Sequence, residues 1–226
     1  MRKLRILIPL IIVPVIITIG VGIMSDKQYA LVALLVTVAA LAYMFLGFNN
    51  SQTNIRYIVV LSVMSALSVL SRCVFTFLPA FKPMTAIIIL TGMYLGPEGG
   101  FMCGALTALF SNFFFAQGPW TPFQMFAFGI LGLASGLIKK PLRKSTTLLL
   151  IYGAIGGIAY SLIMDIWTVL WYSGGFAWDL YGASVVAALP FMALYMISNV
   201  VFLIILKKAF GRKMNRMIYK YNILGE

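Results

Sequence analysis

Apolar segments occupy almost the whole of this chain, and they constrain its fold more than any other feature. Eight of them alternate with short polar connections, at residues 4–24, 29–48, 55–78, 84–95, 99–115, 121–138, 148–172 and 184–206. A helix that spans a bilayer needs about 20 mainly apolar residues, and most of these segments are close to that length. With 62% hydrophobic and 10% charged residues, the chain is too apolar for a soluble domain. The sequence therefore predicts an all-α, polytopic membrane helical bundle.

The positions of the basic residues predict how the bundle is oriented. Most of the 17 lysines and arginines lie in MRKLR at the N-terminus, in the connection KKPLRKS, or after residue 206. Cytoplasmic loops carry such an excess of Lys and Arg, so both termini are predicted to be cytoplasmic, with MRKLR starting an uncleaved first span. This topology accounts for the net charge of +12 without a nucleic-acid partner.

The segment 84–95 is the shortest of the eight. At the rise of an α-helix its twelve residues extend about 18 Å, and by length alone it could be re-entrant or part of a broken helix. If it did not cross, KKPLRKS and the basic tail would lie on the opposite side of the membrane from MRKLR. The charge distribution therefore favours a crossing.

The stretch from Gly96 to Gly136 predicts a helical hairpin around the turn AQGPWT. Small residues recur there at four-residue spacing, at Gly100, Gly104 and Ala108 and again at Gly132 and Gly136. This spacing allows two helix backbones to approach closely in lipid. Uncharged polar residues gather near the turn, at Ser111, Asn112, Gln117, Thr121 and Gln124. The hairpin is therefore either the wall of a binding site or a packing hairpin with a solvated turn.

Two ionisable residues, Arg72 and Asp165, lie inside predicted spans. Each is about 9 to 10 Å below the outer end of its segment, at helical rise. Because unpaired charges are costly in lipid, we expect them either to pair with each other or to face a solute pocket open to the outside; the two interpretations are compatible. The chain contains no His, which leaves little material for a proton relay.

Aromatic and polar residues also converge on the predicted outer side, in the loops FLPAFKPM, AQGPWT and YSGGFAWDLY. Trp and Tyr commonly anchor proteins at the membrane boundary, but three converging loops favour a small-molecule site. Catalysis is not expected. The two cysteines, Cys73 and Cys103, lie in apolar segments, and no motif has the spacing of metal ligands.

The run FKPMTAIIILTGMYLGPEGGFMCGALTALFSNFFFAQGPWTPFQMFAFGILGLASG resembles the substrate-binding S component of energy-coupling factor (ECF) vitamin transporters. More narrowly, it is similar to the group associated with cobalamin uptake. The resemblance extends over residues 55–206 and implies a six-helix substrate-binding core. Residues 1–54 would then form two additional transmembrane helices, and residues 207–226 a basic cytoplasmic tail.

The resemblance also implies a mechanism. An S component captures its vitamin from outside, associates with a membrane-embedded T subunit and two cytoplasmic ATPases, and topples in the membrane to release the vitamin. The chain has no Walker A motif, so ATP would act only through partner subunits. No covalently bound cofactor and no metal are expected, and cobalamin or a related corrinoid would be the transported substrate. Family members often dock through an AxxxAxxxA face on the first core helix, to which Ser62 and Ala66 correspond here in part.

The expected binding surface combines charged, amide and aromatic side chains from these loops. It comprises Arg72, Phe81, Lys82, Met84, Asn112, Gln117, Trp120, Thr121, Gln124, Asp165 and Trp171. Aromatics and Met84 would line the site, the amides would bind peripheral amides, and Arg72 and Lys82 would bind a phosphate or carboxamide. The alternatives are an S component for folate, pantothenate or a queuosine precursor, or a stand-alone secondary transporter.

Overall fold

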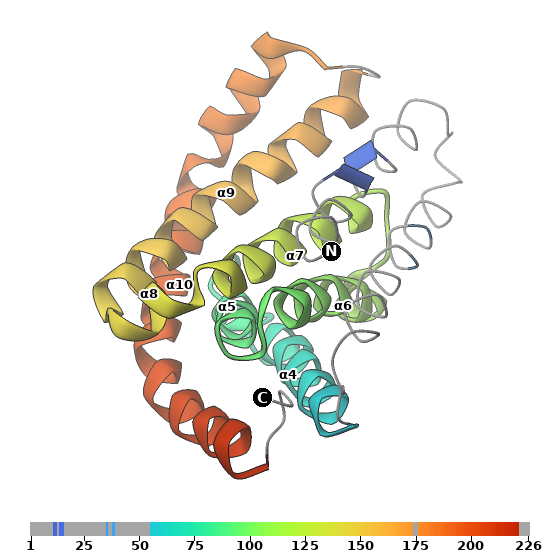
Figure 1. The fold of residues 1–226 in the computed structure, drawn as a ribbon. Coiled ribbons are helices and arrows are strands. Elements are labelled where there is room, and N and C mark those ends of the chain that lie inside the picture. Colours follow the sequence, from blue (N-terminus) through green and yellow to red (C-terminus); the bar gives the residue numbers. More distant parts are fainter. Residues whose placement is uncertain are drawn as a thin grey trace.

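The computed structural model of the chain describes residues 55–173 and 176–221, with residues 11, 12, 14, 15, 35 and 38. Over these two long stretches every element is a helix, which confirms the predicted all-α class (Figure 1). The helices are α4 (Ile55–Val74), α5 (Met84–Leu95), α6 (Pro97–Phe115), α7 (Thr121–Leu137), α8 (Lys139–Lys144), α9 (Thr146–Ser173) and α10 (Trp178–Tyr221). Of these, α4, α9 and α10 are long and apolar enough to cross a membrane. Apart from those six single residues, the two helices predicted in residues 1–54 lie outside the described residues.

Several boundaries differ from the sequence prediction, and the start of α10 at Trp178 lies six residues before the predicted segment 184–206. Helix α4 ends at Val74, and turns connect it to Pro79, which itself disfavours helical geometry only in Leu78. The connection KKPLRKS contains a short helix, α8. Helix α10 continues past residue 206 to Tyr221, so the predicted basic tail is helical over its described part. This extension is amphipathic, since Met214 is buried and Phe210, Met217 and Ile218 pack against the core.

Helix α5 lies at the centre of the bundle. All twelve of its residues are buried, and it contacts α4, α6, α7, α8 and α10. A helix that is apolar on every side is stable when it is buried on every side. Because protein surrounds it, α5 can be shorter than a lipid-exposed span, at about 18 Å. Its crossing of the membrane stays a prediction.

The small residues of the hairpin bring helix backbones into contact, as their spacing predicts. A Cβ atom added to Gly132 would lie 2.1 Å from the carbonyl oxygen of Gly100, and one added to Gly104 would lie 2.3 Å from that of Phe128. Helix α5 joins the same contact, because a Cβ atom on Gly92 would lie 2.0 Å from the carbonyl oxygen of Gly132. These distances leave no room for a side chain, so α5, α6 and α7 form a rigid unit.

The C-terminal end of α5 is held by Arg143 of α8. Its Nε donates a hydrogen bond to the carbonyl oxygen of Met93 (3.1 Å), and its Nη2 to that of Tyr94 (3.3 Å). The guanidinium also lies 4.8 Å from the centroid of the Tyr94 ring. A cation that bonds the last carbonyls of a helix satisfies groups that have no partner within the helix. Arg143 therefore fixes the end of α5 opposite to Met84.

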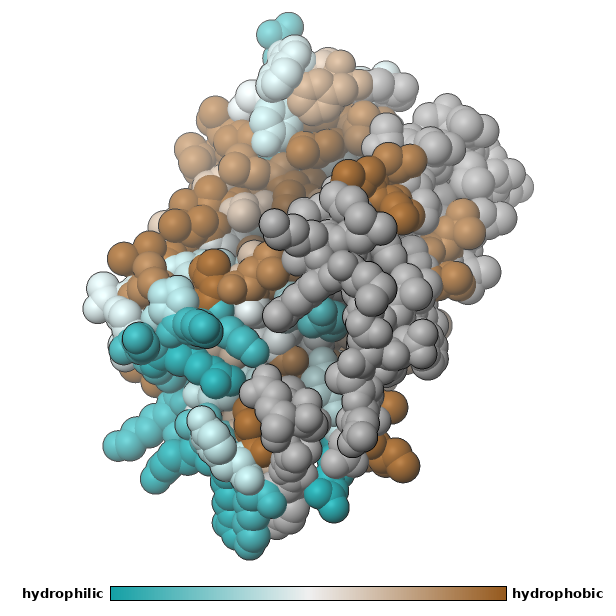
Figure 2. All heavy atoms as spheres, in the orientation of Figure 1, coloured by the Kyte–Doolittle hydropathy of each residue, from teal (hydrophilic) through white to brown (hydrophobic). Residues whose placement is uncertain are grey.

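Basic side chains gather at one end of the molecule. Figure 2 shows hydrophilic residues around α8 and the C-terminal part of α10, and apolar residues over the face that α9 and the first part of α10 present. The exposed basic residues there are Lys140, Lys144, Lys208, Arg212, Lys213, Arg216 and Lys220. Such a separation of apolar sides from one basic end is that of a protein embedded in a membrane.

Candidate substrate-binding site

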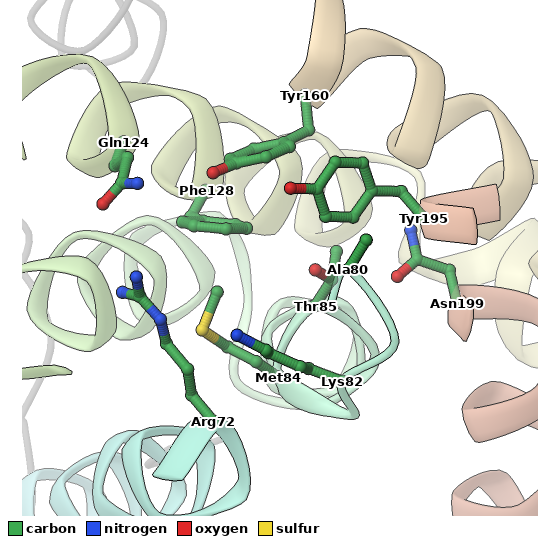
Figure 3. Close-up of a pocket in the computed structure, with 10 residues that line it drawn as sticks. All are labelled: Arg72, Ala80, Lys82, Met84, Thr85, Gln124, Phe128, Tyr160, Tyr195 and Asn199. Atoms are coloured by element: carbon green, nitrogen blue, oxygen red, sulfur yellow. The ribbon is translucent and has the colours of Figure 1, made fainter. Parts of the chain in front are cut away.

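A cavity of about 110 Å³ lies where α4, α5, α7, α9 and α10 meet (Figure 3). The helices supply its walls, and the connection between α4 and α5 supplies part of its rim. The lining residues are Arg72, Ala80, Lys82, Met84, Thr85, Gln124, Phe128, Tyr160, Tyr195 and Asn199. Arg72, Lys82, Met84 and Gln124 are among the residues predicted from the sequence.

Two cations enter this cavity from neighbouring elements. Arg72 lies in the last turn of α4, closer to the helix end than the sequence predicts, because α4 is shorter than expected. Its guanidinium carbon lies 4.7 Å from the centroid of the Phe115 ring, and Lys82 Nζ lies 5.3 Å from the same centroid. No Asp or Glu belongs to the described lining. The cavity is therefore positively charged.

Lys82 is held in place through its backbone. Its N–H donates a hydrogen bond to Ser198 Oγ (2.9 Å), and Ser198 Oγ donates one to the Lys82 carbonyl oxygen (3.0 Å). Ala80, two residues earlier, has a φ of 59°, in the left-handed region that residues other than glycine rarely adopt. Burial lowers the pKa of the Lys82 ammonium, and the charge of Arg72 lowers it further.

A buried hydrogen-bond network holds Arg72. Its Nη1 donates to Ser111 Oγ (2.5 Å) and to Asn112 Oδ1 (2.8 Å). Asn112 Nδ2 in turn donates to Thr121 Oγ1 and to Gln124 Oε1, both at 2.9 Å. Asn112 and Thr121 are 0% exposed. The polar residues of the hairpin thus position the guanidinium, and only Gln124 among them also lines the cavity.

Gln117 closes the turn behind this network. Its Nε2 donates to the carbonyl oxygen of Leu109 (2.9 Å), and its Oε1 accepts a hydrogen bond from Thr121 Oγ1 (2.9 Å). Asn112, Gln117 and Thr121 therefore lie behind the lining, where they contact one another. None of the three belongs to the described lining, so the direct solute contacts that the sequence analysis expects of them stay a prediction.

An aromatic wall faces the two cations. Phe128 and Tyr160 stack with their ring centroids 4.4 Å apart, and Tyr160 meets Tyr195 edge to face at 5.1 Å. Figure 3 shows both tyrosine hydroxyls directed into the cavity. Asn199, beside Tyr195, donates through Nδ2 to the carbonyl oxygen of Gly153 (2.9 Å).

Sequence reasoning missed this aromatic wall. A usable signal was present, because tyrosine and asparagine within an apolar span need a polar partner or a cavity. That signal marks Tyr160, Tyr195 and Asn199, but not Phe128.

The remaining predicted aromatic residues lie outside the lining. Trp120 meets Trp167 edge to face at 5.9 Å, and Trp167 stacks on Trp171 at 6.2 Å. Phe81 packs against Phe202 with a centroid distance of 5.1 Å. These residues form aromatic contacts that are separate from the cavity lining.

Asp165 does not pair with Arg72 in the described part of the chain, so the alternative of an Arg–Asp pair is not what the structure shows. Its Oδ1 accepts a hydrogen bond from Ser184 Oγ (2.9 Å), which joins α9 to α10. The residue is 7% exposed, and its Oδ2 has no hydrogen-bond partner among the described residues. Asp165 is not part of the cavity lining.

Ser62 and Ala66 lie on the outward face of α4, where both are exposed. Leu61, Met64 and Ser65 form the opposite, buried face of the same helix. The alternative that the two small residues pack within this protein is therefore not supported by the described residues. Because their side chains are small, Ser62 and Ala66 leave a shallow, accessible strip on α4 beside the larger exposed side chains of Val63 and Leu67.

An apolar helical bundle that encloses a small pocket of converging polar and aromatic groups defines a membrane-embedded solute-binding protein. Residues 56–209 match the family model described as ECF transporter, substrate-specific component. This match covers most of the 226 residues, and the chain belongs to that family. It is accordingly the substrate-binding component of a transporter and not an enzyme. No curated protein and no solved structure matches the chain.

Proposed function

We propose that this protein captures a vitamin-like solute from the outer side of the membrane in the cavity between α4, α5, α7, α9 and α10. It then delivers the solute in an importer formed with a T subunit and two cytoplasmic ATPases. The observation that carries the proposal is the convergence of Arg72, Lys82 and the aromatic wall within the residues that match the S-component family. In the proposed orientation, the basic end formed by α8 and the end of α10 faces the cytoplasm.

Two candidate substrates follow from different observations. Cobalamin or a related corrinoid follows from the resemblance of the run that begins FKPMT and ends at Gly136 to the cobalamin-associated group. The cavity volume of about 110 Å³ supports a smaller vitamin, because pockets for drug-sized ligands have about 300 to 1,000 Å³ and a corrinoid is larger still. A corrinoid would require the outer parts of the helices to separate.

Two measurements on the full-length protein test the proposal. Purified protein in lipid nanodiscs is titrated with cobalamin, cobinamide, folate and pantothenate, and tagged protein is isolated from cells that also produce a T subunit and two ATPases. We expect one vitamin to bind and the partner subunits to copurify. Absence of both would contradict the proposal. Solute uptake by the protein alone in liposomes, driven by an ion gradient, would instead show a secondary transporter.

We also propose that the exposed Ser62–Ala66 strip of α4 is where the T subunit docks. Leucine at both positions fills the space that a partner helix would need. Ser62→Leu with Ala66→Leu should abolish copurification of the T subunit and vitamin uptake, while vitamin binding is retained.

Ala183→Leu with Ala187→Leu is the matched control, because these residues are exposed on α10 at the same spacing. Equal loss of copurification in both double variants would contradict docking at α4.

A further inference from the structure

We infer that the substrate of this cavity carries a carboxylate or phosphate group on a body about the size of a single ring. The inference rests on the proposed function, because it treats the cavity as the solute site. It names the chemical class of the solute from the charge, the free donors and the dimensions of the described lining.

The first argument concerns hydrogen-bond donors. Arg72 uses Nη1 for Ser111 and Asn112, and its Nε and Nη2 make no hydrogen bond to the described residues. The Lys82 ammonium likewise makes none to the described residues, although it lies over the Phe115 ring. A guanidinium and an ammonium with free N–H groups match the oxygens of a carboxylate or a phosphate.

The second argument concerns charge. Arg72 and Lys82 approach the same ring, and the described lining contains no acidic side chain to balance them. Asp165, the buried carboxylate of α9, is bonded to Ser184 and lies outside the lining. Uncompensated cations are costly in a partly buried site, and an anionic ligand would remove this cost, whereas a neutral amide would leave it.

The third argument concerns size and shape. A cavity of about 150 Å³ accommodates benzene, so a volume of about 110 Å³ suits a group no larger than one ring. The rings of Phe128 and Tyr160 provide a flat surface for such a group, opposite the cations. The hydroxyls of Tyr160 and Tyr195 face the cavity and can bind polar substituents.

The test compares molecules that differ in charge but little in shape. Wild-type protein in lipid nanodiscs is titrated by calorimetry with nicotinate and nicotinamide, and with pyridoxal phosphate and pyridoxal, with cobalamin as a large ligand. The first pair tests a carboxylate and the second tests a phosphate. We expect the anionic member of at least one pair to bind about tenfold or more tightly than its neutral counterpart.

Variants then assign the preference to the two cations. Lys82→Met and Arg72→Gln should each remove most of the preference for the anion, and Lys82→Arg should retain it. Lys208→Met is the matched control, because Lys208 is exposed at the far end of α10 and should leave the preference unchanged. Lys82 lies in a connection between helices, so its variant provides the measurement if Arg72→Gln fails to fold.

Equal or tighter binding of the neutral members would overturn the inference. So would failure of every anionic probe to bind, or tight binding of cobalamin that persists in both variants. If the importer still assembles and binds another vitamin in those cases, the proposed function stands without the inference. If neither assembly nor any vitamin binding is found, the proposed function itself fails.

Discussion

Each end of α5 lies near an arginine from a neighbouring helix, Arg72 of α4 and Arg143 of α8, and the two arginines have similar surroundings but different hydrogen bonds. Arg143 at one end and Arg72 at the other each lie over an aromatic ring, at 4.8 Å and 4.7 Å from its centroid. Arg143 directs two of its nitrogens to the last carbonyls of α5. Arg72 is held through one nitrogen by the α6–α7 hairpin and keeps the other two free of the described residues.

The difference in bonding supports the separate roles that we propose for the two arginines. A guanidinium that bonds the end of a helix completes the fold, because it satisfies carbonyls that would otherwise lack partners. A guanidinium that is fixed at one side and free at the other is oriented for a ligand, because its position no longer costs entropy when the ligand arrives. The contact with an aromatic ring is common to both and does not distinguish them.

The largest expected effect is a difference in ligand affinity between variants of the two arginines. Arg72→Gln should weaken binding of the anionic ligand by about 1.5 to 3 kcal/mol, the usual contribution of hydrogen bonds to charged groups. Arg143→Gln should leave the affinity within about twofold, since it removes no group from the cavity lining. Titration calorimetry on both variants measures this, and a similar loss of affinity in both would break the comparison.

A second prediction concerns the network behind Arg72. Asn112→Ala removes one of the two acceptors of Arg72 Nη1 and the amide group that donates to Thr121 and Gln124. We expect it to lower the free energy of unfolding by about 1 to 3 kcal/mol, because buried polar groups lose their partners, and to weaken ligand binding as well. Denaturant unfolding and ligand titration measure the two effects. Unchanged affinity in a destabilised protein would show that Arg72 does not depend on the network for its position.

A third prediction concerns stability at the other end of α5. Arg143→Gln should lower the free energy of unfolding by about 1 to 2 kcal/mol, because two carbonyls at the helix end lose a charged donor. Lys144→Gln is the matched control, since Lys144 is exposed in the same short helix. The measurement is denaturant unfolding in detergent, and equal stability of Arg143→Gln and the wild type would contradict a capping role.

The smallest expected effect is a pH dependence of anion binding at the end of α5 that lies near Arg72 and Lys82. The pKa of Lys82 is lowered by burial and by the charge of Arg72, with a smaller opposing effect from Cys73. Affinity for an anion should therefore be constant near neutral pH and fall at alkaline pH as Lys82 loses its proton. The ligand-free protein should gain stability over the same range, because the unfolded chain binds this proton more tightly. Titrations at increasing pH should show the fall in wild type and none in Lys82→Met.

The hairpin shows how far prediction from the sequence extends into the site. The spacing of Gly100, Gly104 and Gly132 predicts close helix contact, and the structure confirms it, because small side chains permit that approach wherever the helices lie. The same stretch predicts Gln124 at the cavity, and the structure places it in the lining. Asn112 and Thr121 were expected to face the solute but lie behind Arg72, since residue type does not specify which partner a polar group finds.

The sequence by itself determined the membrane-embedded helical class, because apolar segments of spanning length and clustered basic charge are local properties of the chain. It also determined the S-component family, through residues 56–209. Only the tertiary structure decided that Tyr160 and Tyr195 complete the wall of the cavity and that Arg72 donates to the Asn112 amide and the Ser111 hydroxyl instead of to Asp165. These contacts join residues far apart in the chain, and their geometry depends on how α4, α6, α7, α9 and α10 pack together.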